Sequence, residues 1–362
     1  MNHPPDHVFV LPTLKIAGGN LEVVRLAEEL RGRGENVAII GMWGTQAPIR
    51  CDDIPASTLF DGPVKPSGAL LSLPLIFLRF LKVQRFRSPR TKFIFTHYAT
   101  YLLAPLVRRR RRWFFVQALE WYFVPPGPRR SALRSFIASA YRKGRLLAAN
   151  PFLRRSLEQR GLRVEATADI WAAPFFDEEG GGGREYDVAL MFRKGVPKRA
   201  DWGTALLERL RASRPLLRAV IISPDDEFAG MAGPGDTFLL RPSREEIRDA
   251  YQRSRVFILF SDHEGFGLPP LEAMGCGCVP LCRDAGGVRA YMEPSLEANI
   301  IPLDASHEVM IGRLFEILDD RVEWSRLSAL SRQVFRDGLR RAADRLAELE
   351  RCGFVSGEGT SP

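Results

Sequence analysis

The sequence predicts an α/β protein that is built from two Rossmann-like domains. Apolar, β-prone runs alternate along the chain with segments of helical periodicity, which is typical of parallel sheets covered by helices. A chain of 362 residues exceeds one ordinary core, so two domains are expected. The Gly-rich run Glu178–Arg184 has the composition of a flexible linker. The domain limits that we expect are 1–175, a linker at 176–185, 186–335, and a terminal helix with a disordered tail at 336–362.

Charge is distributed unevenly along the chain. Residues 1–175 contain 27 Lys and Arg against 12 Asp and Glu, a net charge of +15, whereas the remainder has a net charge of −6. A basic half of this kind indicates an anionic partner, which could be nucleic acid, an anionic membrane surface or a diphosphate-bearing substrate. Nucleic acid is disfavoured, because no groove-reading or RNA-binding motif occurs.

The N-terminus shows no signal peptide, and no run reaches the roughly 18 apolar residues of a membrane span. Five cysteines, an odd number, fit a reducing cytosol. Cys276, Cys278 and Cys282 cluster, but their spacing matches no familiar zinc pattern, so small buried thiols are expected there and no metal site. We therefore expect a cytoplasmic protein.

The first domain opens with a strand, a loop containing Gly18 and Gly19, and a helix. Backbone N–H groups of such a loop can receive an anion or a sugar hydroxyl, although a plain tight turn is an equal alternative. Strands are expected at 8–11, 37–40, 92–96, 113–116 and 146–150, and helices at 21–31, 131–141 and 151–159.

Two segments of this domain have an unusual composition. One is both basic and apolar, and the other is densely basic. Residues 69–87 would suit an interfacial helix, and the five arginines Arg108–Arg112 would suit a polybasic patch on anionic lipid, at about 1 kcal/mol per basic residue. The alternatives are a packed helix and a solvated charge run. We favour the packed helix for 69–87 and the membrane surface for the arginine run.

In the second domain, the stretch after the apolar run Val256–Phe260 organises the interpretation. A Gly-rich turn carries Glu264, and a helix that opens near Leu268 carries Glu272. Strand, Gly-rich turn, helix and strand in this order place a ligand at the carboxyl edge of a parallel sheet. Further strands are expected at 187–192, 217–222, 237–240 and 279–281, and a long amphipathic helical stretch at 324–351.

These motifs resemble those of a known family. The stretch from Glu264 to Glu272, followed by Ala273-Met-Gly-Cys-Gly277, closely resembles the E-x7-E signature of glycosyltransferase family 4, the large retaining GT-B group. Arg193-Lys-Gly-Val-Pro-Lys198 resembles the R-x4-K pair of that family, and Asp284-Ala-Gly-Gly287 matches its next loop, although Arg289-Ala290 replace an acid often found there. The resemblance covers nearly the whole chain. It implies a GT-B fold, with two Rossmann-like domains facing across a cleft and a C-terminal helical stretch packing back.

Chemistry supports the resemblance. Negative charge grows on the diphosphate of a nucleotide-sugar as the glycosidic bond breaks, and without a metal motif fixed cations must stabilise it. By resemblance, Glu272 accepts the ribose hydroxyls and His97 contacts the donor sugar. The expected catalytic residues are Glu264, His97, Arg193 and Lys198. The expected substrate-binding residues are Gly18, Gly19, Asn20, Gln117, Glu120, Asn150, Arg241, Gly265, Phe266, Gly267, Leu268 and Glu272.

A finer resemblance concerns the donor. Phe114-Phe-Val-Gln-Ala-Leu-Glu120, Tyr122-Phe-Val-Pro125 and Ala140-Tyr-Arg-Lys-Gly144 are similar to the N-terminal domain of bacterial rhamnosyltransferases that use dTDP-β-L-rhamnose. The acid that usually follows the Gln is replaced by Ala118 here, so the donor stays open between dTDP-, UDP- and GDP-sugars.

The expected function is that of a retaining, metal-independent glycosyltransferase. It would move a hexose or deoxyhexose from a nucleotide-sugar to a lipid-linked bacterial surface glycan, in lipopolysaccharide or exopolysaccharide synthesis, at the inner face of the cytoplasmic membrane. The alternatives are a sugar-nucleotide epimerase or soluble synthase of the same fold, and an inactive glycan- or partner-binding subunit. The sequence specifies neither the base, the sugar, the linkage nor the oligomeric state.

Overall fold

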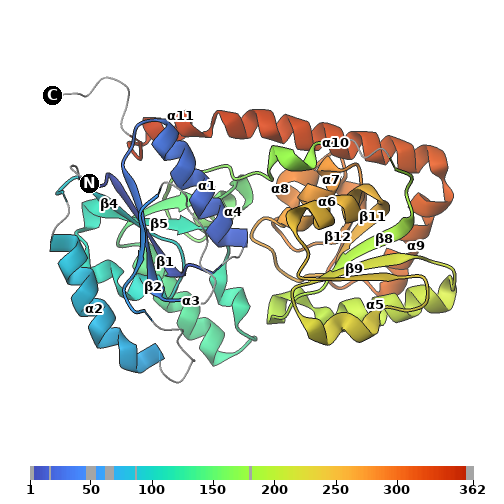
Figure 1. Ribbon diagram of the computed structural model, residues 1–362, viewed down its shortest axis with the longest axis horizontal. Helices are drawn as coiled ribbons and strands as arrows, with labels where there is room; N and C mark the ends of the chain where they lie inside the picture. Colours follow the sequence, from blue (N-terminus) through green and yellow to red (C-terminus); the bar gives the residue numbers. More distant parts are fainter. Residues whose placement is uncertain are drawn as a thin grey trace. The chain divides into compact units, whose positions relative to one another are not determined.

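The computed structural model describes residues 4–15, 18–45, 54–61, 69–85, 88–178 and 182–355. The chain forms two compact units, each with one parallel sheet and helices on both of its faces (Figure 1). The first unit contains Met1–Trp121, Pro126–Ile170 and Asp344–Pro362, and the second contains Tyr122–Pro125 and Trp171–Ala343. The units thus divide at Ile170, ahead of the linker predicted at 176–185, of which residues 179–181 lie outside the described part. Of the terminal helix and tail predicted at 336–362, residues 356–362 also lie outside it.

The first unit is built on a seven-stranded parallel sheet of order β3-β2-β1-β4-β5-β6-β7. The inner strand β1 pairs with β2 on one side and with β4 on the other, with Val8 opposite Ala38 and Phe93. The strands are β1 His7–Thr13, β2 Val37–Trp43, β3 Ala56–Thr58, β4 Lys92–Phe95, β5 Arg112–Val116, β6 Arg145–Ala148 and β7 Val164–Thr167. The helices are α1 Gly18–Gly32, α2 Ala69–Arg85, α3 Pro128–Tyr141, α4 Pro151–Glu158 and α11 Arg345–Arg351.

The predicted strands of this unit are confirmed because their apolar runs are buried on both faces, as parallel sheets require. Phe80 of α2 packs edge-on against Phe93 of β4, with ring centroids 5.6 Å apart. One boundary differs from the expectation. Helix α1 begins at Gly18 and not at Leu21, so Gly18 and Gly19 form its first turn and not a preceding loop.

The end of the chain packs into the first unit at the amino edge of its sheet. The ring of Phe354 is fully buried and lies 4.9 Å from both the His7 and the Trp113 rings. The Phe354 carbonyl contacts His7 Nε2 at 2.6 Å and accepts from Lys92 Nζ at 2.9 Å. Burial lowers the pKa of His7 to about 4, so this ring is neutral at pH 7. The C-terminal segment is therefore part of the core of the first unit.

The second unit is built on a six-stranded parallel sheet of order β10-β9-β8-β11-β12-β13. Its central strands β8 and β11 pair through Val188 opposite Val256. The strands are β8 Tyr186–Met191, β9 Ala219–Ser223, β10 Thr237–Leu240, β11 Ser254–Leu259, β12 Val279–Arg283 and β13 Ile300–Ile301. The helices are α5 Ala200–Ser213, α6 Arg244–Gln252, α7 Leu268–Gly275, α8 Arg289–Met292, α9 His307–Asp319 and α10 Arg321–Ala343.

Helix α10 is attached to the second unit by a close contact with Trp171. The indole Nε1 donates to the Phe335 carbonyl at 3.0 Å. A Cβ on Gly338 would lie 1.9 Å from the Trp171 ring, so only glycine fits at that position. The predicted helical stretch 324–351 is therefore two helices, α10 in the second unit and α11 in the first, with Asp344 between them.

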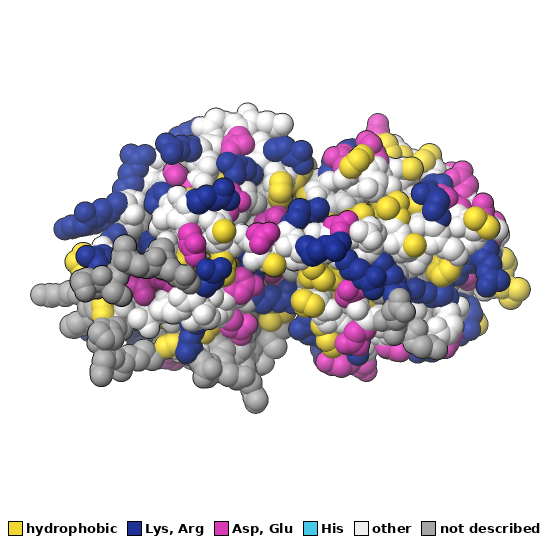
Figure 2. Space-filling view, turned by 90° about the horizontal axis from the view of Figure 1, so that it is seen from above, with side chains coloured by type: hydrophobic (Ala, Val, Ile, Leu, Met, Phe, Trp, Pro, Cys, Tyr) yellow, Lys and Arg dark blue, Asp and Glu magenta, His cyan; other side chains and the backbone are white. Residues whose placement is uncertain are grey.

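The arginine run differs from the exposed patch that the sequence predicts. Arg111 and Arg112 are buried: Arg111 Nε donates to the Thr91 carbonyl at 2.8 Å, and Arg112 donates to the Val107 and Lys143 carbonyls. Their guanidinium groups satisfy backbone acceptors at the start of β5, and only Arg108, Arg109 and Arg110 are exposed. Figure 2 shows that Lys and Arg side chains prevail over acidic ones along the margin of the first unit.

No helix in the described ranges is long and apolar enough to cross a membrane.

We expect the Phe354→Ala variant to lower the free energy of unfolding of the first unit by about 3–5 kcal/mol, because it empties a fully buried ring site. Chemical denaturation followed by Trp fluorescence measures this change. Leu216→Ala is the control, since that side chain is 90% exposed and its removal should change stability by less than about 0.5 kcal/mol. Equal midpoints for the two variants would show that the C-terminal segment does not belong to the core.

Candidate functional site

Both sheets reverse their strand order beside the first strand, and ligands of open α/β sheets bind outside the carboxyl ends of the strands at such a reversal. In the second unit the reversal lies between β8 and β11. The predicted residues Arg193 and Lys198 follow β8, and Glu264 follows β11. The structure therefore brings the two motifs, 66 residues apart in the chain, to one edge of the sheet.

The two motifs meet through an ion pair. Lys198 Nζ donates to Glu264 Oε1 at 2.8 Å and to Oε2 at 2.9 Å. The side chains are 26% and 14% exposed, so the pair is partly shielded but open to a ligand. Burial acts to raise the pKa of Glu264, yet the Lys198 ammonium and the Ser261 hydroxyl keep that pKa below its ordinary value. Glu264 is therefore an anion at neutral pH.

The turn that carries Glu264 is fixed by the loop after β12. Glu264 N–H donates to the Ala285 carbonyl at 2.8 Å, and Gly287 N–H donates to the Glu264 carbonyl at 3.1 Å. A Cβ on Gly287 would lie 2.6 Å from the Phe266 nitrogen, so the motif Asp284-Ala-Gly-Gly287 needs glycine there. Gly267 has φ +84°, a conformation suited to glycine, and its carbonyl accepts from Tyr291 Oη at 2.7 Å.

Arg193 lies within electrostatic range of Glu264, and Glu272 shares tyrosine neighbours with both. Arg193 is exposed, and its charge helps to lower the pKa of Glu264. Burial raises the pKa of Tyr251 far above its usual value, with a further rise from Glu272 and an opposing effect of Arg193. The two residues thus act on the same buried hydroxyl. Glu272 likewise shares the neighbouring Tyr291 hydroxyl with Glu264, so these three predicted residues act on a common pair of buried tyrosines.

Two other predicted residues of this unit have structural roles. Phe266 is buried against the Trp171 and Tyr291 rings, at centroid distances of 5.7 and 5.3 Å, so its side chain belongs to the core and not to a ligand surface. Arg241 has φ +49° and donates from Nε to the Pro224 carbonyl at 3.1 Å, which holds the end of β10 against the end of β9.

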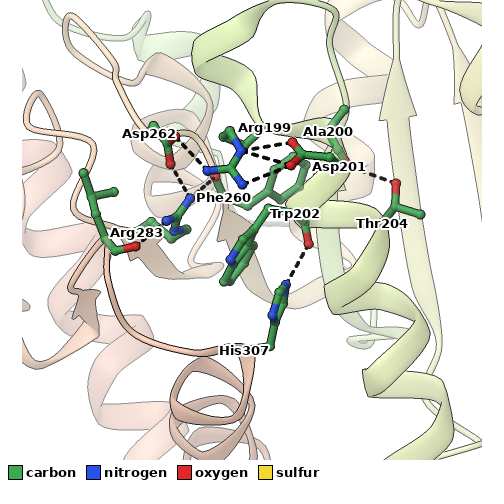
Figure 3. A network of polar contacts seen from close by, with 10 residues as sticks. Arg199, Ala200, Asp201, Trp202, Thr204, Phe260, Asp262, Arg283 and His307 are labelled. Atoms are coloured by element: carbon green, nitrogen blue, oxygen red, sulfur yellow. Dashed lines mark hydrogen bonds and ion pairs between the residues drawn. The ribbon is translucent and has the colours of Figure 1, made fainter. Parts of the chain in front are cut away.

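A network of arginines and acids includes Arg199 and Asp262, which flank Lys198 and Glu264 in the sequence (Figure 3). Arg199 bridges Asp201 and Asp262, at 3.0 and 2.8 Å, and Asp262 also accepts from Arg283. Arg283 is only 3% exposed, and its guanidinium lies 4.6 Å from the centre of the Trp202 ring. Burial acts to lower the pKa of Arg283, which makes its acidic partner necessary.

This network connects the loops that carry Lys198 and Glu264. Asp262 N–H donates to the Pro197 carbonyl at 2.8 Å, so the residue next to Lys198 is bonded to the turn that precedes Glu264. Trp202 in turn stacks on His307, with centroids 4.1 Å apart, and its carbonyl contacts His307 Nε2 at 3.1 Å. The sequence interpretation did not select these residues. The sequence did contain one signal that could have identified this network: an acid, Asp262, and an arginine, Arg283, occur at the ends of neighbouring strands.

In the first unit, the carboxyl edge presents His97 after β4 and Glu120 after β5. His97 Nε2 lies 3.8 Å from Glu120 Oε1, which accepts from the Tyr98 N–H at 3.2 Å. Burial lowers the pKa of His97 to about 4 and raises the pKa of Glu120 to about 8. At pH 7 both groups are therefore uncharged and offer hydrogen bonds without a net charge.

The remaining predicted residues of the first unit separate into two groups. A Cβ on Gly19 would lie 2.5 Å from Gln117 Oε1, so Gln117 lies directly over the first turn of α1, which begins at Gly18. Asn20 instead closes the loop before α1, donating to the Thr13 and Lys15 carbonyls. Asn150 is completely buried, and its Oδ1 caps α4 through the Leu153 N–H at 2.9 Å, so its side chain has a structural role.

The clustered cysteines Cys276, Cys278 and Cys282 are free and buried. Burial raises the pKa of the Cys276 thiol to about 12, and it raises the other two as well. Within the described ranges, no group of three or more His, Cys, Asp or Glu side chains is arranged to bind a metal ion.

Sequence comparison assigns part of the second unit to a family. Residues 234–334 match the family described as Glycosyl transferases group 1, a region that includes Glu264 and Glu272. The lipopolysaccharide core biosynthesis mannosyltransferase LpsB of Rhizobium meliloti (strain 1021) is 31% identical over 135 residues, 37% of each chain. A putative glycosyltransferase 41 of the Sulfolobus islandicus filamentous virus (isolate Iceland/Hveragerdi) is 41% identical over 75 residues, which are 21% of this chain and 22% of the viral protein. The chain thus spans well under half the length of these curated relatives.

Structural comparison covers almost the whole chain. The sucrose-phosphate synthase from Thermosynechococcus elongatus has a TM-score of 0.74 at 14% identity, over 97% of this chain and 99% of that one. HepE of Anabaena, in complex with UDP and glucose, has a TM-score of 0.69 at 15% identity, over 96% and 99%. These likenesses establish the fold, which is the GT-B fold of two Rossmann-like parallel sheets.

We expect Arg283→Met to lower the free energy of unfolding of the second unit by about 2–4 kcal/mol, because it leaves Asp262 and two backbone carbonyls without their buried donor. The matched control is Arg209→Met, whose ion pair with Glu308 is 54% and 62% exposed and should contribute less than about 1 kcal/mol. Denaturant titration of both variants measures the difference. An Arg283 variant as stable as the Arg209 control would contradict a structural role for the network.

The raised pKa of Glu120 predicts a pH-dependent contribution to stability. The folded state retains a proton between the ordinary pKa of about 4.5 and the shifted pKa of about 8, so the stability contributed by the protonated carboxyl is lost as pH rises through this window. The Glu120→Gln variant should therefore flatten the decline of Tm between pH 6.5 and 8.5, a range above the titration of His97. Glu158→Gln, an exposed acid on α4, is the control. Parallel Tm profiles for the wild type and Glu120→Gln would refute the shift.

Proposed function

We propose that the protein is a metal-independent, retaining glycosyltransferase that transfers a hexose or deoxyhexose from a nucleotide-sugar to a bacterial surface glycan. The observation that carries the proposal is the Lys198–Glu264 pair at the strand reversal of the second sheet. Arg193 lies within electrostatic range of Glu264, and Glu272 acts on the Tyr251 and Tyr291 hydroxyls that Arg193 and Glu264 also influence. The two cations Lys198 and Arg193 and the two carboxylates of Glu264 and Glu272 follow strands at the carboxyl edge of a parallel sheet. This combination suits a ligand that has both a diphosphate and hydroxyl groups.

The cations would act on the leaving group. As the bond between the sugar and the diphosphate breaks, an electron pair remains on the phosphate oxygen, and Lys198 and Arg193 would stabilise that charge. Lys198 is positioned in advance by two hydrogen bonds to Glu264, so it loses little rotamer freedom when the diphosphate binds. Pro269 and Pro270 lack N–H groups, so direct backbone donors at the start of α7 are limited to residues such as Gly267 and Leu268.

The carboxylates would orient the donor. Glu272, half-buried in α7, would accept hydrogen bonds from the ribose hydroxyls, and Glu264 would accept those of the donor sugar near the reacting carbon. Retention of configuration is the outcome when the acceptor attacks on the face from which the diphosphate leaves. In that geometry the acceptor hydroxyl transfers its proton to the departing diphosphate, and no protein base is required.

The first unit would bind hydroxyl-bearing groups. His97 and Glu120, both uncharged at pH 7, and Gln117 over the first turn of α1 offer donors and acceptors without an ionic preference. Such groups suit sugar hydroxyls better than a diphosphate. We assign the glycan acceptor, in lipopolysaccharide or exopolysaccharide synthesis, to this unit, with an anionic membrane surface as the place where a lipid-linked acceptor is found.

Relatives and motifs point to different donors. LpsB is named a mannosyltransferase, and a GDP-mannose:cellobiosyl-diphosphopolyprenol α-mannosyltransferase of Xanthomonas oryzae pv. oryzae is 40% identical over 45 residues. The motif from Phe114 to Glu120 instead favours dTDP-L-rhamnose. A calorimetric panel of GDP-mannose, dTDP-L-rhamnose and UDP-glucose separates these donors.

We expect Lys198→Ala to lower kcat/KM about 10²–10³-fold and Glu272→Ala to weaken nucleoside diphosphate binding about 10–100-fold, with folding unchanged. Release of nucleoside diphosphate from the donor of the panel measures activity, and calorimetry measures binding. The matched control is Lys194→Ala, a neighbouring cation that is 58% exposed and paired with Glu227. If both variants kept full activity, the site assignment would be wrong, and if the wild type bound no nucleotide, a partner-binding subunit would replace the enzyme.

A further inference from the structure

Helix α2 has apolar side chains on two opposite faces. On the inner face, Ile76 and Phe80 are fully buried, and Phe80 packs on the rings of Phe93 and Phe95. On the outer face, four leucines are exposed: Leu71 (85%), Leu75 (41%), Leu78 (60%) and Leu81 (43%). A helix on the surface of a protein ordinarily turns polar side chains outward. The outer face of α2 therefore has a composition suited to an apolar surrounding.

The exposed leucines form a continuous stripe. Leu71, Leu75 and Leu78 are separated by four and three residues, a spacing that places them above one another on one side of a helix. Among the other described residues, exposed large hydrophobic side chains occur singly on any one helix or strand, as Phe136 does on α3 and Val322 on α10. Isolated exposed residues are normal, whereas a row of them marks an interaction surface.

Charge identifies the kind of partner. No Asp or Glu occurs between Asp61 and Glu120, while this segment contains 12 Lys and Arg residues. On α2 itself, Lys82 is exposed beside the leucines, and the exposed arginines Arg108–Arg110 belong to the same acid-free segment. A second copy of this face would bring like charges together, so self-association is disfavoured. Arg79 of α2 is paired with Asp61 at 3.4 Å, whereas Lys82 and Arg108–Arg110 belong to a stretch of sequence without acids. Leucines next to such an excess of cations suit the interface of an anionic lipid bilayer.

We propose that α2 is the element that docks the protein on an anionic membrane, with Leu71, Leu75 and Leu78 inserted among the lipid headgroups and acyl ends and Lys82 at the phosphates. The sequence analysis favours a packed helix for 69–87 and a membrane surface for the arginine run. In this proposal the roles are reversed, because Arg111 and Arg112 are structural and the helix provides the lipid-facing surface. The proposal deepens the proposed function, since a lipid-linked acceptor lies at a bilayer, but it rests on the α2 face alone.

The test uses the full chain with vesicles of phosphatidylcholine alone and of phosphatidylcholine with an equal amount of phosphatidylglycerol. We expect cosedimentation with the anionic vesicles only, weakening as salt screens the cationic part. In the triple variant Leu71→Gln/Leu75→Gln/Leu78→Gln, binding should fall at least about tenfold, because Gln retains helix propensity but removes the apolar stripe. Leu216→Gln, the 90% exposed leucine of the second unit, is the control and should bind as the wild type does.

Two further measurements separate the possible outcomes. Donor binding by calorimetry should be equal in the triple variant and the wild type, so a failure of the docking proposal is distinguishable from a failure of the proposed function. The Tm of the triple variant should equal that of the wild type, because the replaced side chains are exposed. Undiminished vesicle binding by the triple variant, or no binding by the wild type, would overturn the proposal. So would a wild-type dimer that the triple variant converts to a monomer, because the stripe would then join two copies of the chain.

Discussion

The ion pair between Lys198 and Glu264 is the contact around which the carboxyl edge of the second sheet is arranged. Glu264 is 14% exposed, and a carboxylate in that position stays ionised only beside a cation. The two residues follow different strands, β8 and β11, so the pair can form only where the strand order of the sheet reverses. Three features fix the two loops that carry the pair: the glycine at 287, the hydrogen bond from Asp262 to Pro197 and the buried Arg283.

The sequence was sufficient to predict the inner strands and the charged motifs, for a physical reason, but not the edge strands β3, β7 and β13. Strands that are buried on both faces appear as apolar runs, and the residues that follow such runs must lie at the carboxyl edge of a parallel sheet. This reasoning selected Arg193, Lys198 and Glu264 correctly as residues of one edge. It could not select the network of Arg199, Asp262, Arg283, Trp202 and His307, because these side chains come from four segments whose contacts depend on the packing of α5 and α9.

Where the prediction differed from the structure, local chemistry explains the difference. Asn150 precedes Pro151 at the start of a helix, and this Asn-Pro pair is itself a signal for a helix cap, so a structural role was readable from the sequence. Arg111 and Arg112 could not be read in this way. Whether an arginine faces solvent or a backbone carbonyl depends on distant residues such as Thr91 and Lys143. A run of like charges therefore does not establish a charged surface.

Buried carboxyl groups also have opposite protonation states at the two sheet edges. Burial raises the pKa of an acid at both edges, but in the second unit the charge of Lys198 outweighs burial, whereas in the first unit Glu120 lies beside a histidine that burial keeps neutral. The second edge thus keeps fixed charges, which suit a diphosphate because the Lys198–Glu264 pair is partly shielded from water. The first edge keeps neutral hydrogen-bonding groups, which bind hydroxyls without attracting the same diphosphate. This difference in protonation supports the proposal that donor and acceptor are bound by separate units, because each edge disfavours the ligand that the other one suits.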